Sequence, residues 1–112
     1  MRYLCNAFSL QMVLAKLQNP GDSVLVRVTA LTKDEAAMVL KEADFTSAIG
    51  HADTAAVVSD ALQVNAECNR CFVTLDNGDI CIVAQVKGGR LPEGATTLPE
   101  GMDLGWYFVE LV

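Results

Sequence analysis

The chain has 112 residues, of which 52% are hydrophobic and only 6% aromatic, and its formal net charge is −6. The hydrophobic fraction excludes a disordered chain, and the length is that of one domain able to bury its own core. The negative charge excludes a surface that coats long nucleic acid, because phosphate contacts require a basic face, but it permits a small anion in a local pocket.

The sequence carries no sign of membrane insertion or export. It contains no run of about 18 apolar residues, the length that a membrane-spanning helix requires. Its first residues, MRYLCNAFSLQM, make a poor signal peptide, because Asn6 and Ser9 interrupt the apolar run. We therefore expect a cytoplasmic protein without a membrane partner.

The first third of the chain predicts a strand, a helix and a second strand. Residues 3–7 are typical of a short strand, and Ser9 is placed to cap a helix with apolar residues at helical spacing from Leu10 to Leu17. A turn at residues 19–22 follows. In residues 23–31 valines alternate with Arg27 and Thr29, which predicts a half-buried strand.

The remainder of the chain predicts two helices and three strands. Residues 32–35, Thr-Lys-Asp-Glu, form a capping box that starts a second helix, and a third helix is expected over residues 52–62. Residues 71–75 and 80–86 are expected to form a hairpin around Asn77-Gly78 with a type I′ turn, and the apolar run ICIVAQV should be a central strand. A glycine- and proline-rich loop spans residues 87–101, and residues 106–112 close the sheet. The expected fold is a single α/β domain over residues 1–112, with a mixed five-stranded β-sheet flanked by about three helices.

Four cysteines leave two interpretations open. Cys68 and Cys71 form one C-x-x-C pair, while Cys5 and Cys81 lie in expected strands. A structural zinc site normally needs two such pairs, so we favour small, buried or half-buried apolar residues in a reducing compartment over a metal or redox site. No metal site and no cofactor is predicted.

The only histidine of the chain, His51, lies in the stretch SAIGHADTA just before the third expected helix. An ordinary surface or capping histidine is the simplest interpretation. At a helix start, however, the imidazole lies among free backbone N–H groups and at the positive end of the helix dipole, where a phosphate is attracted. Gly50 would let the backbone approach such a ligand closely, and His51 could then transfer a proton to it.

Two further stretches carry candidate ligand-binding groups. Arg90 and Glu93, in GGRLPEG, follow the central strand, and the planar guanidinium suits phosphate, although the two residues could equally form an exposed ion pair. Asn69, Arg70 and the interior Gln85 are polar groups near the same sheet, and Gln85 needs a hydrogen-bond partner.

Asn6 and Ser9, in CNAFS, add polar groups where the first strand ends, although Ser9 alone is more often a cap. The chain has no second histidine, no nucleophile elbow and no P-loop. If the protein is an enzyme, its residues favour metal-free acid–base chemistry by a His, an Arg and a Glu. This set fits cleavage of RNA by its own 2′-hydroxyl.

The segments NAFSLQM, SAIGH-x-x-TA, Asn69-Arg70 and Q…RLPEG occur together in one order, and in this the chain resembles the viral and plasmid ring nucleases that act as type III anti-CRISPR proteins. The resemblance implies a homodimer that encloses cyclic tetra-adenylate and cuts it, without metal, into linear di-adenylates ending in 2′,3′-cyclic phosphate. It implies catalytic roles for His51, Arg90 and Glu93. The one departure is the Gly88-Gly89 pair, which makes the spacing from Gln85 to Arg90 one residue longer.

The resemblance also implies that Asn6, Ser9 and Gln85 hold the ligand, and Gly50, Asn69 and Arg70 are added to the candidate binding residues on the evidence of their positions. The leading hypothesis is thus a metal-independent ring nuclease in the cytoplasm, that of the host if the protein is viral. A module that sequesters a cyclic nucleotide or binds a protein without turnover is the alternative. A protein whose four cysteines ligate one structural metal ion is a third hypothesis.

Overall fold

The computed structural model describes residues 1–112. Its elements are β1 (Arg2–Cys5), the 3-10 helix η1 (Leu10–Lys16), β2 (Val26–Leu31), α1 (Lys33–Glu42), β3 (Thr46–Ser47), α2 (Ala52–Leu62), β4 (Ile80–Lys87) and β5 (Asp103–Leu111). The five strands form one sheet in the order β2-β5-β4-β1-β3. β1 pairs in parallel with β3 and β4, and β5 pairs antiparallel with β2 and β4. The predicted α/β domain with a mixed five-stranded sheet and three helices is confirmed.

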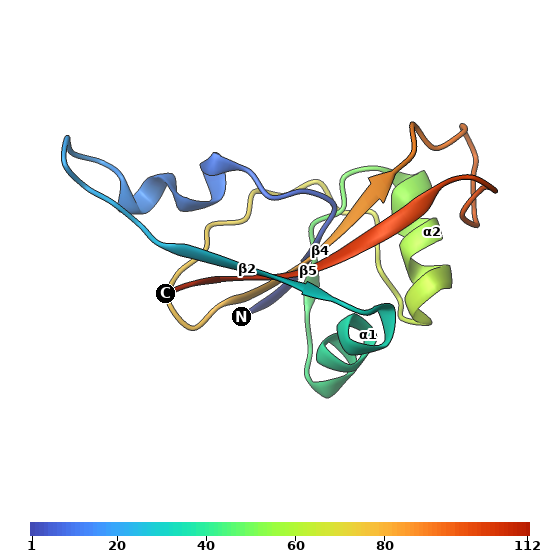
Figure 1. Ribbon diagram of the computed structural model, residues 1–112, viewed down its shortest axis with the longest axis horizontal. Coiled ribbons are helices and arrows are strands. Elements are labelled where there is room, and N and C mark those ends of the chain that lie inside the picture. Colours follow the sequence, from blue (N-terminus) through green and yellow to red (C-terminus); the bar gives the residue numbers. More distant parts are fainter.

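The helices α1 and α2 cover one face of the sheet and η1 lies over the other (Figure 1), and each face has its own core. On one face Ile82 and Ala84 of β4 pack with Trp106 and with buried residues of α1 and α2. On the other face Cys81 and Val83 of β4 pack under η1. Because β4 is buried on both faces over Cys81–Ala84 and is the middle strand, the prediction of a central strand is confirmed.

The helix boundaries follow the capping signals in the sequence. Thr32 Oγ1 accepts a hydrogen bond of 3.1 Å from the Glu35 backbone N–H, and Glu35 Oε1 accepts one of 2.9 Å from the Thr32 N–H, so the capping box of α1 is present. α2 has the predicted bounds and ends at Gln63, whose φ of 54° lies in the left-handed region. The first helix forms as a 3-10 helix, and the Ser9 side chain makes no capping bond.

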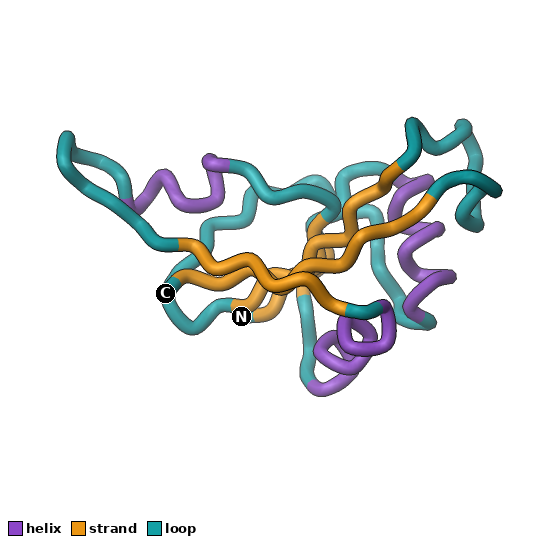
Figure 2. Tube along the Cα trace, in the orientation of Figure 1, coloured by secondary structure: helices purple, strands orange, loops and turns teal.

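The predicted hairpin over residues 71–86 is wrong. Residues 71–75 form no strand and run as loop before β4 (Figure 2). Both edges of β4 are already paired, one with β1 and the other with β5, so no edge remains for a hairpin partner. Val73 and Leu75 are nevertheless buried, and the Leu75 N–H donates to the Met12 carbonyl of η1 instead.

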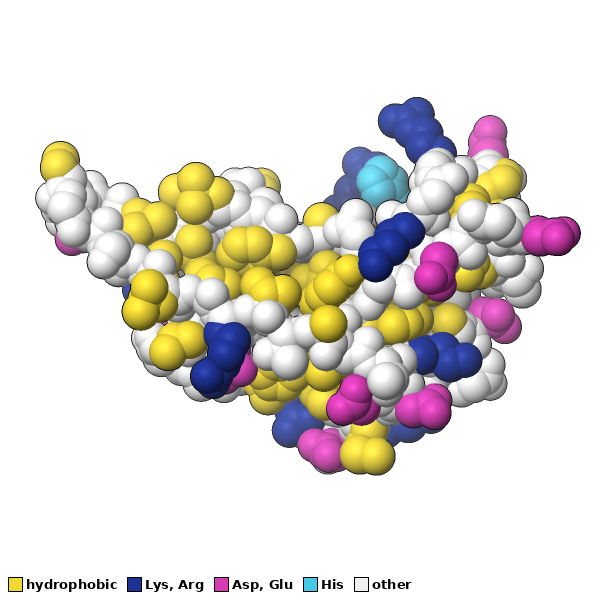
Figure 3. All heavy atoms as spheres, viewed as in Figure 1, with side chains coloured by type: hydrophobic (Ala, Val, Ile, Leu, Met, Phe, Trp, Pro, Cys, Tyr) yellow, Lys and Arg dark blue, Asp and Glu magenta, His cyan; other side chains and the backbone are white.

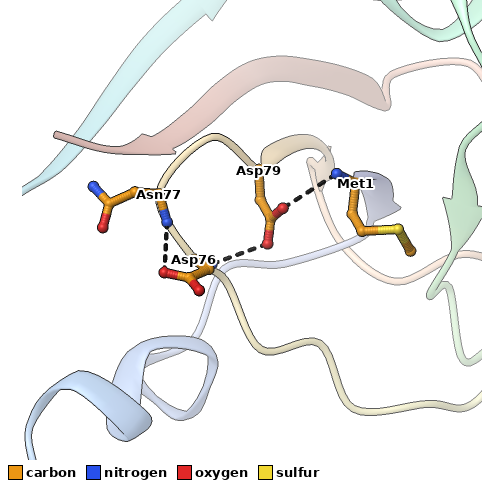
Figure 4. A network of polar contacts seen from close by, with 4 residues as sticks. All are labelled: Met1, Asp76, Asn77 and Asp79. Atoms are coloured by element: carbon orange, nitrogen blue, oxygen red, sulfur yellow. Dashed lines mark hydrogen bonds and ion pairs between the residues drawn. The ribbon is translucent and has the colours of Figure 1, made fainter.

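The turn before β4 is also different from the predicted type I′. Gly78 has a φ of +92°, but Asn77 does not have the positive φ that type I′ requires. Carboxylates hold the turn: Asp79 Oδ2 accepts 2.9 Å from the Asp76 N–H, and Asp79 Oδ1 accepts 3.2 Å from the N-terminal ammonium of Met1 (Figure 4). Asp76 Oδ1 accepts 2.8 Å from the Asn77 N–H.

The edges of the sheet depart from the sequence-based picture. The sheet reaches five strands through β3, which was not predicted, and not through residues 71–75. β3 is only two residues long, too short for an alternating pattern to indicate it. β2 begins at Val26 rather than Ser23 and is an edge strand with Val28 56% exposed, so it is less buried than predicted. No helix is long and apolar enough to cross a membrane.

The cysteines divide into two kinds. Cys5 and Cys81 are buried, as expected, with their sulfur atoms 3.3 Å apart, whereas Cys68 and Cys71 are exposed. The hydrogen bond with Cys5, together with burial, raises the pKa of the Cys81 thiol, which therefore stays protonated. No group of three or more His, Cys, Asp or Glu side chains is placed to hold a metal ion, so the arrangement does not support four cysteines around one ion.

Candidate functional site

The carboxyl ends of the parallel strands β1, β3 and β4 meet at one edge of the sheet. Asn6 directly follows β1, and Gly50 and His51 follow β3 by a few residues. Gln85 lies near the end of β4. In open α/β sheets, ligands bind outside the carboxyl ends of the strands, so this edge is the first place to look for a site.

A pocket of about 440 Å³ lies at this edge. Its lining includes Asn6, His51, Gln85 and Arg90, four of the residues singled out in the sequence, which come from four separate segments of the chain. Asp53 and Thr54, from the first turn of α2, line it as well and were not predicted. In Figure 3 the histidine lies beside Lys and Arg side chains, at one side of a hollowed face.

His51 occupies the cap position of α2. Its backbone is extended, with φ −124° and ψ 128°, and its carbonyl accepts 3.0 Å from the Ala55 N–H. The imidazole is exposed and makes no capping hydrogen bond, which agrees with the simplest interpretation of a surface histidine at a helix start and leaves both ring nitrogens without a partner in the helix. It thus lies at the positive end of the α2 dipole and is free to contact a ligand in the pocket.

Hydrogen bonds to Ser47 fix the segment that carries His51. Ser47 Oγ donates 2.6 Å to the Glu67 carbonyl, and Asn69 Nδ2 donates 2.7 Å to the Ser47 carbonyl. The Asn69 N–H also donates 2.8 Å to the Ile49 carbonyl. Asn69 does not line the pocket of His51, and its amide holds the backbone that positions the imidazole.

A second pocket, of about 330 Å³, adjoins the first and shares Asn6 and His51 with it. Arg70 and Gly50 line this pocket, and Arg70 Nε donates 2.9 Å to the Gly50 carbonyl. A Cβ atom on Gly50 would lie 3.2 Å from Arg70 Cγ, so the glycine lets the arginine cross the chain closely. Both predicted residues therefore belong to the same site as His51.

Ser9 lies farther along the same groove. It lines a small cavity of about 110 Å³ that Asn6 also lines. Because its hydroxyl does not cap η1, it is available to a ligand that extends from His51 toward η1.

The loop after β4 carries Arg90 to the pocket. Gly88 has a φ of +95°, and a Cβ there would lie 2.9 Å from the Gly101 carbonyl oxygen, so the two ends of the loop touch closely. The Gly94 N–H donates 3.2 Å to Asp53 Oδ1, which ties the loop to α2. The longer spacing through Gly88-Gly89 is accommodated, since Arg90 lines the pocket.

Glu93 is on the same loop but does not line the pocket, and it forms no ion pair with Arg90. The predicted contact of Glu93 with the other site residues is therefore not seen. Asp53 is the carboxylate that the fold brings beside His51. The sequence signal for it was its place in the first turn of α2, two positions after the histidine.

Cations at the site lack carboxylate partners, although the whole chain is acidic. The ion pairs with side-chain cations involve Arg2, Lys16 and Arg27, and none involves Arg70, Lys87 or Arg90. Lys87 lies two residues after Gln85 on the same face of β4, with its ammonium 5.5 Å from the centre of the Tyr107 ring. Lys87 lines neither of the pockets that contain His51, so Arg70 and Arg90 are the cations at the site. Two arginines without carboxylate partners beside a histidine suit an anionic ligand.

Comparison with known proteins identifies the family. The family model described as STIV B116-like matches residues 2–106. Uncharacterized protein 26 of the Sulfolobus islandicus filamentous virus (isolate Iceland/Hveragerdi) is 32% identical over 94 residues, which are 84% of this chain and 74% of that protein. The solved structure of B116 of Sulfolobus turreted icosahedral virus (STIV) has the same fold, with a TM-score of 0.74, 22% identity and 97% of each chain covered. The chain belongs to the STIV B116-like family.

Proposed function

We propose that the protein is a metal-independent ring nuclease that binds cyclic tetra-adenylate and cuts it into linear di-adenylates ending in 2′,3′-cyclic phosphate. By removing this messenger in the cytoplasm of the infected cell, a viral protein would switch off type III CRISPR signalling. The observation that carries the proposal is the pocket at the carboxyl ends of the parallel strands. It joins an uncommitted histidine at a helix start to an arginine without a carboxylate partner.

The reaction needs few groups because the substrate supplies the nucleophile. The ribose 2′-oxygen attacks the adjacent phosphorus, the new O2′–P bond forms and the P–O5′ bond breaks. His51, as imidazolium, gives its proton to the departing 5′-oxygen, and the proton of the 2′-hydroxyl passes to water. Arg90 stabilises the charge that develops on the phosphate oxygens, and Asn6 and Gln85 orient the phosphodiester.

In this scheme Glu93 has no catalytic role, although the resemblance implies one. In the single chain it lies outside the pocket, so we assign it to positioning the Arg90 loop rather than to contact with the substrate. Asp53 already binds this loop through Gly94 and lines the pocket. We therefore propose that Asp53 holds the loop so that Arg90 keeps its position relative to His51.

A homodimer is part of the proposal. Exposed apolar side chains occur at Phe8, Leu10 and Leu14, near or in η1, and at Val28 of β2, with exposures from 37% to 64%. Hydrophobic side chains gather over η1 and β2 in Figure 3, beside the hollow at whose side the histidine lies. A second copy on this surface would bury the apolar side chains, and a two-fold axis would give two cuts per ring.

One assay tests the activity. The purified protein is incubated with labelled cyclic tetra-adenylate in excess EDTA, and the products are separated by chromatography. Linear di-adenylate with 2′,3′-cyclic phosphate is expected at the rate seen without EDTA. Binding without product would instead make the protein a sequestering module, and loss of cleavage in EDTA with rescue by Mn²⁺ or Zn²⁺ would contradict the metal-free mechanism.

A further inference from the structure

Phe72 is a large apolar side chain that the fold leaves in solvent. It is 84% exposed, although burial of a phenylalanine side chain normally stabilises a folded protein. The backbone on both sides is held: the Cys71 thiol is 3.9 Å from the Ser47 carbonyl oxygen, and Val73 is buried in the core under η1. The ring thus projects outward from anchored backbone.

Phe72 lies at the candidate site. It lines the pocket of about 330 Å³ together with Asn6, His51 and Arg70, and it also lines the small cavity that contains Ser9. Arg70 uses Nε to bind the Gly50 carbonyl and has no carboxylate partner, so the rest of its guanidinium is free for a phosphate. An aromatic face next to an unpaired cation matches the two parts of a nucleotide, a flat base and a negative phosphate.

We propose that Phe72 is the platform on which one adenine of the substrate stacks, with the attached phosphate between Arg70 and His51. This inference rests on the proposed function and assigns to Phe72 part of the preference for purine rings. Stacking of a base on an aromatic side chain is worth about 1–3 kcal/mol. A purine presents a larger flat face to the ring than a pyrimidine does, so it gains more contact area. The lining of the pocket is mixed, with the apolar Ala48 and Phe72 beside Asn6, His51 and the Arg70 cation. This mixture suits a nucleotide, which has both a flat base and a charged phosphate, better than a purely apolar protein surface.

The test compares Phe72→Ala and Phe72→Trp with Leu25→Ala as the control, because Leu25 is 70% exposed but lines none of the three pockets of the site. The probe is the 2′-O-methyl ring of four adenylates, which keeps the bases and phosphates but lacks the attacking hydroxyl. Phe72→Ala should weaken its binding about 5- to 150-fold, the range that the loss of one stacked base implies. Phe72→Trp and Leu25→Ala should bind within about twofold of the unchanged protein, and stacking should quench the new indole fluorescence of Phe72→Trp.

The corresponding ring of four uridylates gives the second comparison. The affinity for the uridylate ring should fall less than that for the adenylate ring when Phe72 is replaced by alanine, because a pyrimidine presents a smaller face to the phenyl ring. Unchanged affinity of Phe72→Ala for the adenylate ring, while the unchanged protein still binds and cuts cyclic tetra-adenylate, would overturn the role of Phe72 and leave the proposed function standing. Conversion of a dimer to a monomer by Phe72→Ala, seen by light scattering, would overturn it in favour of a contact between copies. Failure of the unchanged protein to bind either ring and to cut cyclic tetra-adenylate would refute the proposed function, and the inference with it.

Discussion

A hydrogen bond joins the Arg70 side chain to the backbone of Gly50, the residue before the candidate catalytic residue His51. The guanidinium Nε donates 2.9 Å to the Gly50 carbonyl, and the next residue is His51. The contact is sterically close, because a Cβ on Gly50 would lie 3.2 Å from Arg70 Cγ. The same bond therefore orients the guanidinium that we propose binds a phosphate, and it holds the backbone from which the imidazole projects.

Replacing Gly50 by alanine should weaken binding of the cyclic adenylate by about 2- to 10-fold. The new methyl group forces Arg70 to shift, so that its hydrogen bond to the Gly50 carbonyl, worth about 0.5–1.5 kcal/mol, is lost or lengthened. A double-mutant cycle of Gly50→Ala with Arg70→Ala measures this coupling through affinity for the 2′-O-methyl adenylate ring. If the glycine acts through the arginine, Gly50→Ala should have no further effect once Arg70 is alanine. Additive losses would show that the two residues act separately.

The second prediction concerns His51. Replacement by alanine should lower single-turnover cleavage of cyclic tetra-adenylate by about 10²–10⁴-fold, because the leaving 5′-oxygen loses its proton donor. Affinity for the 2′-O-methyl ring should stay within a few-fold, since the phosphate contacts remain. An Asp53→Asn variant is the companion measurement: it leaves the imidazole in place, so it should retain more activity than His51→Ala. Loss of binding with unchanged turnover would make His51 a ligand contact instead.

The third prediction concerns stability against acid. The hydrogen bond from Lys16 to Asp76, 2.5 Å long, and a further bond from the Asn77 backbone lower the pKa of Asp76. A lowered pKa stabilises the folded protein above the unfolded Asp pKa of about 3.9, and this contribution is lost as the pH falls through the folded value. Asp76→Asn should therefore lower Tm at pH 7, and its Tm difference from the unchanged protein should shrink as the pH falls below about 4.

Thermal unfolding from pH 7 to acid checks this dependence. Asp44→Asn is the matched control, because Asp44 is exposed and forms no ion pair, so its effect should be small at every pH. A Tm difference for Asp76→Asn that is as large in acid as at neutral pH would contradict the assigned role of the Lys16 contact.

Local signals in the sequence predicted much of the fold. The capping box of α1 and the apolar stripe of α2 depend on neighbouring residues, and both helices were predicted. Pairing depends on which strand edges are free, and the sequence does not contain this information directly. The Asn77-Gly78 turn signal therefore predicts a hairpin of residues 71–75 with β4, whereas β1 and β5 occupy both edges of β4.

The site was predicted best where residues follow strand ends. Asn6, His51, Gln85 and Arg90 were expected, and the parallel arrangement of β1, β3 and β4 brings them together. Asn69 was expected at the ligand, yet its amide binds the Ser47 carbonyl, because short amide side chains satisfy nearby backbone as readily as a ligand. No sequence pattern indicates a role for Phe72, since only the structure shows that its ring is exposed beside Arg70.

In the proposed reaction the attacking oxygen belongs to the substrate. The most direct measurement compares cleavage of cyclic tetra-adenylate with cleavage of the same ring carrying 2′-deoxyriboses at the scissile positions, with binding measured for both. The deoxy ring should bind but not be cut, and the normal ring should give products with 2′,3′-cyclic phosphate. Cleavage of the deoxy ring at a comparable rate would require a water or protein nucleophile and would contradict the roles assigned to His51 and Arg90.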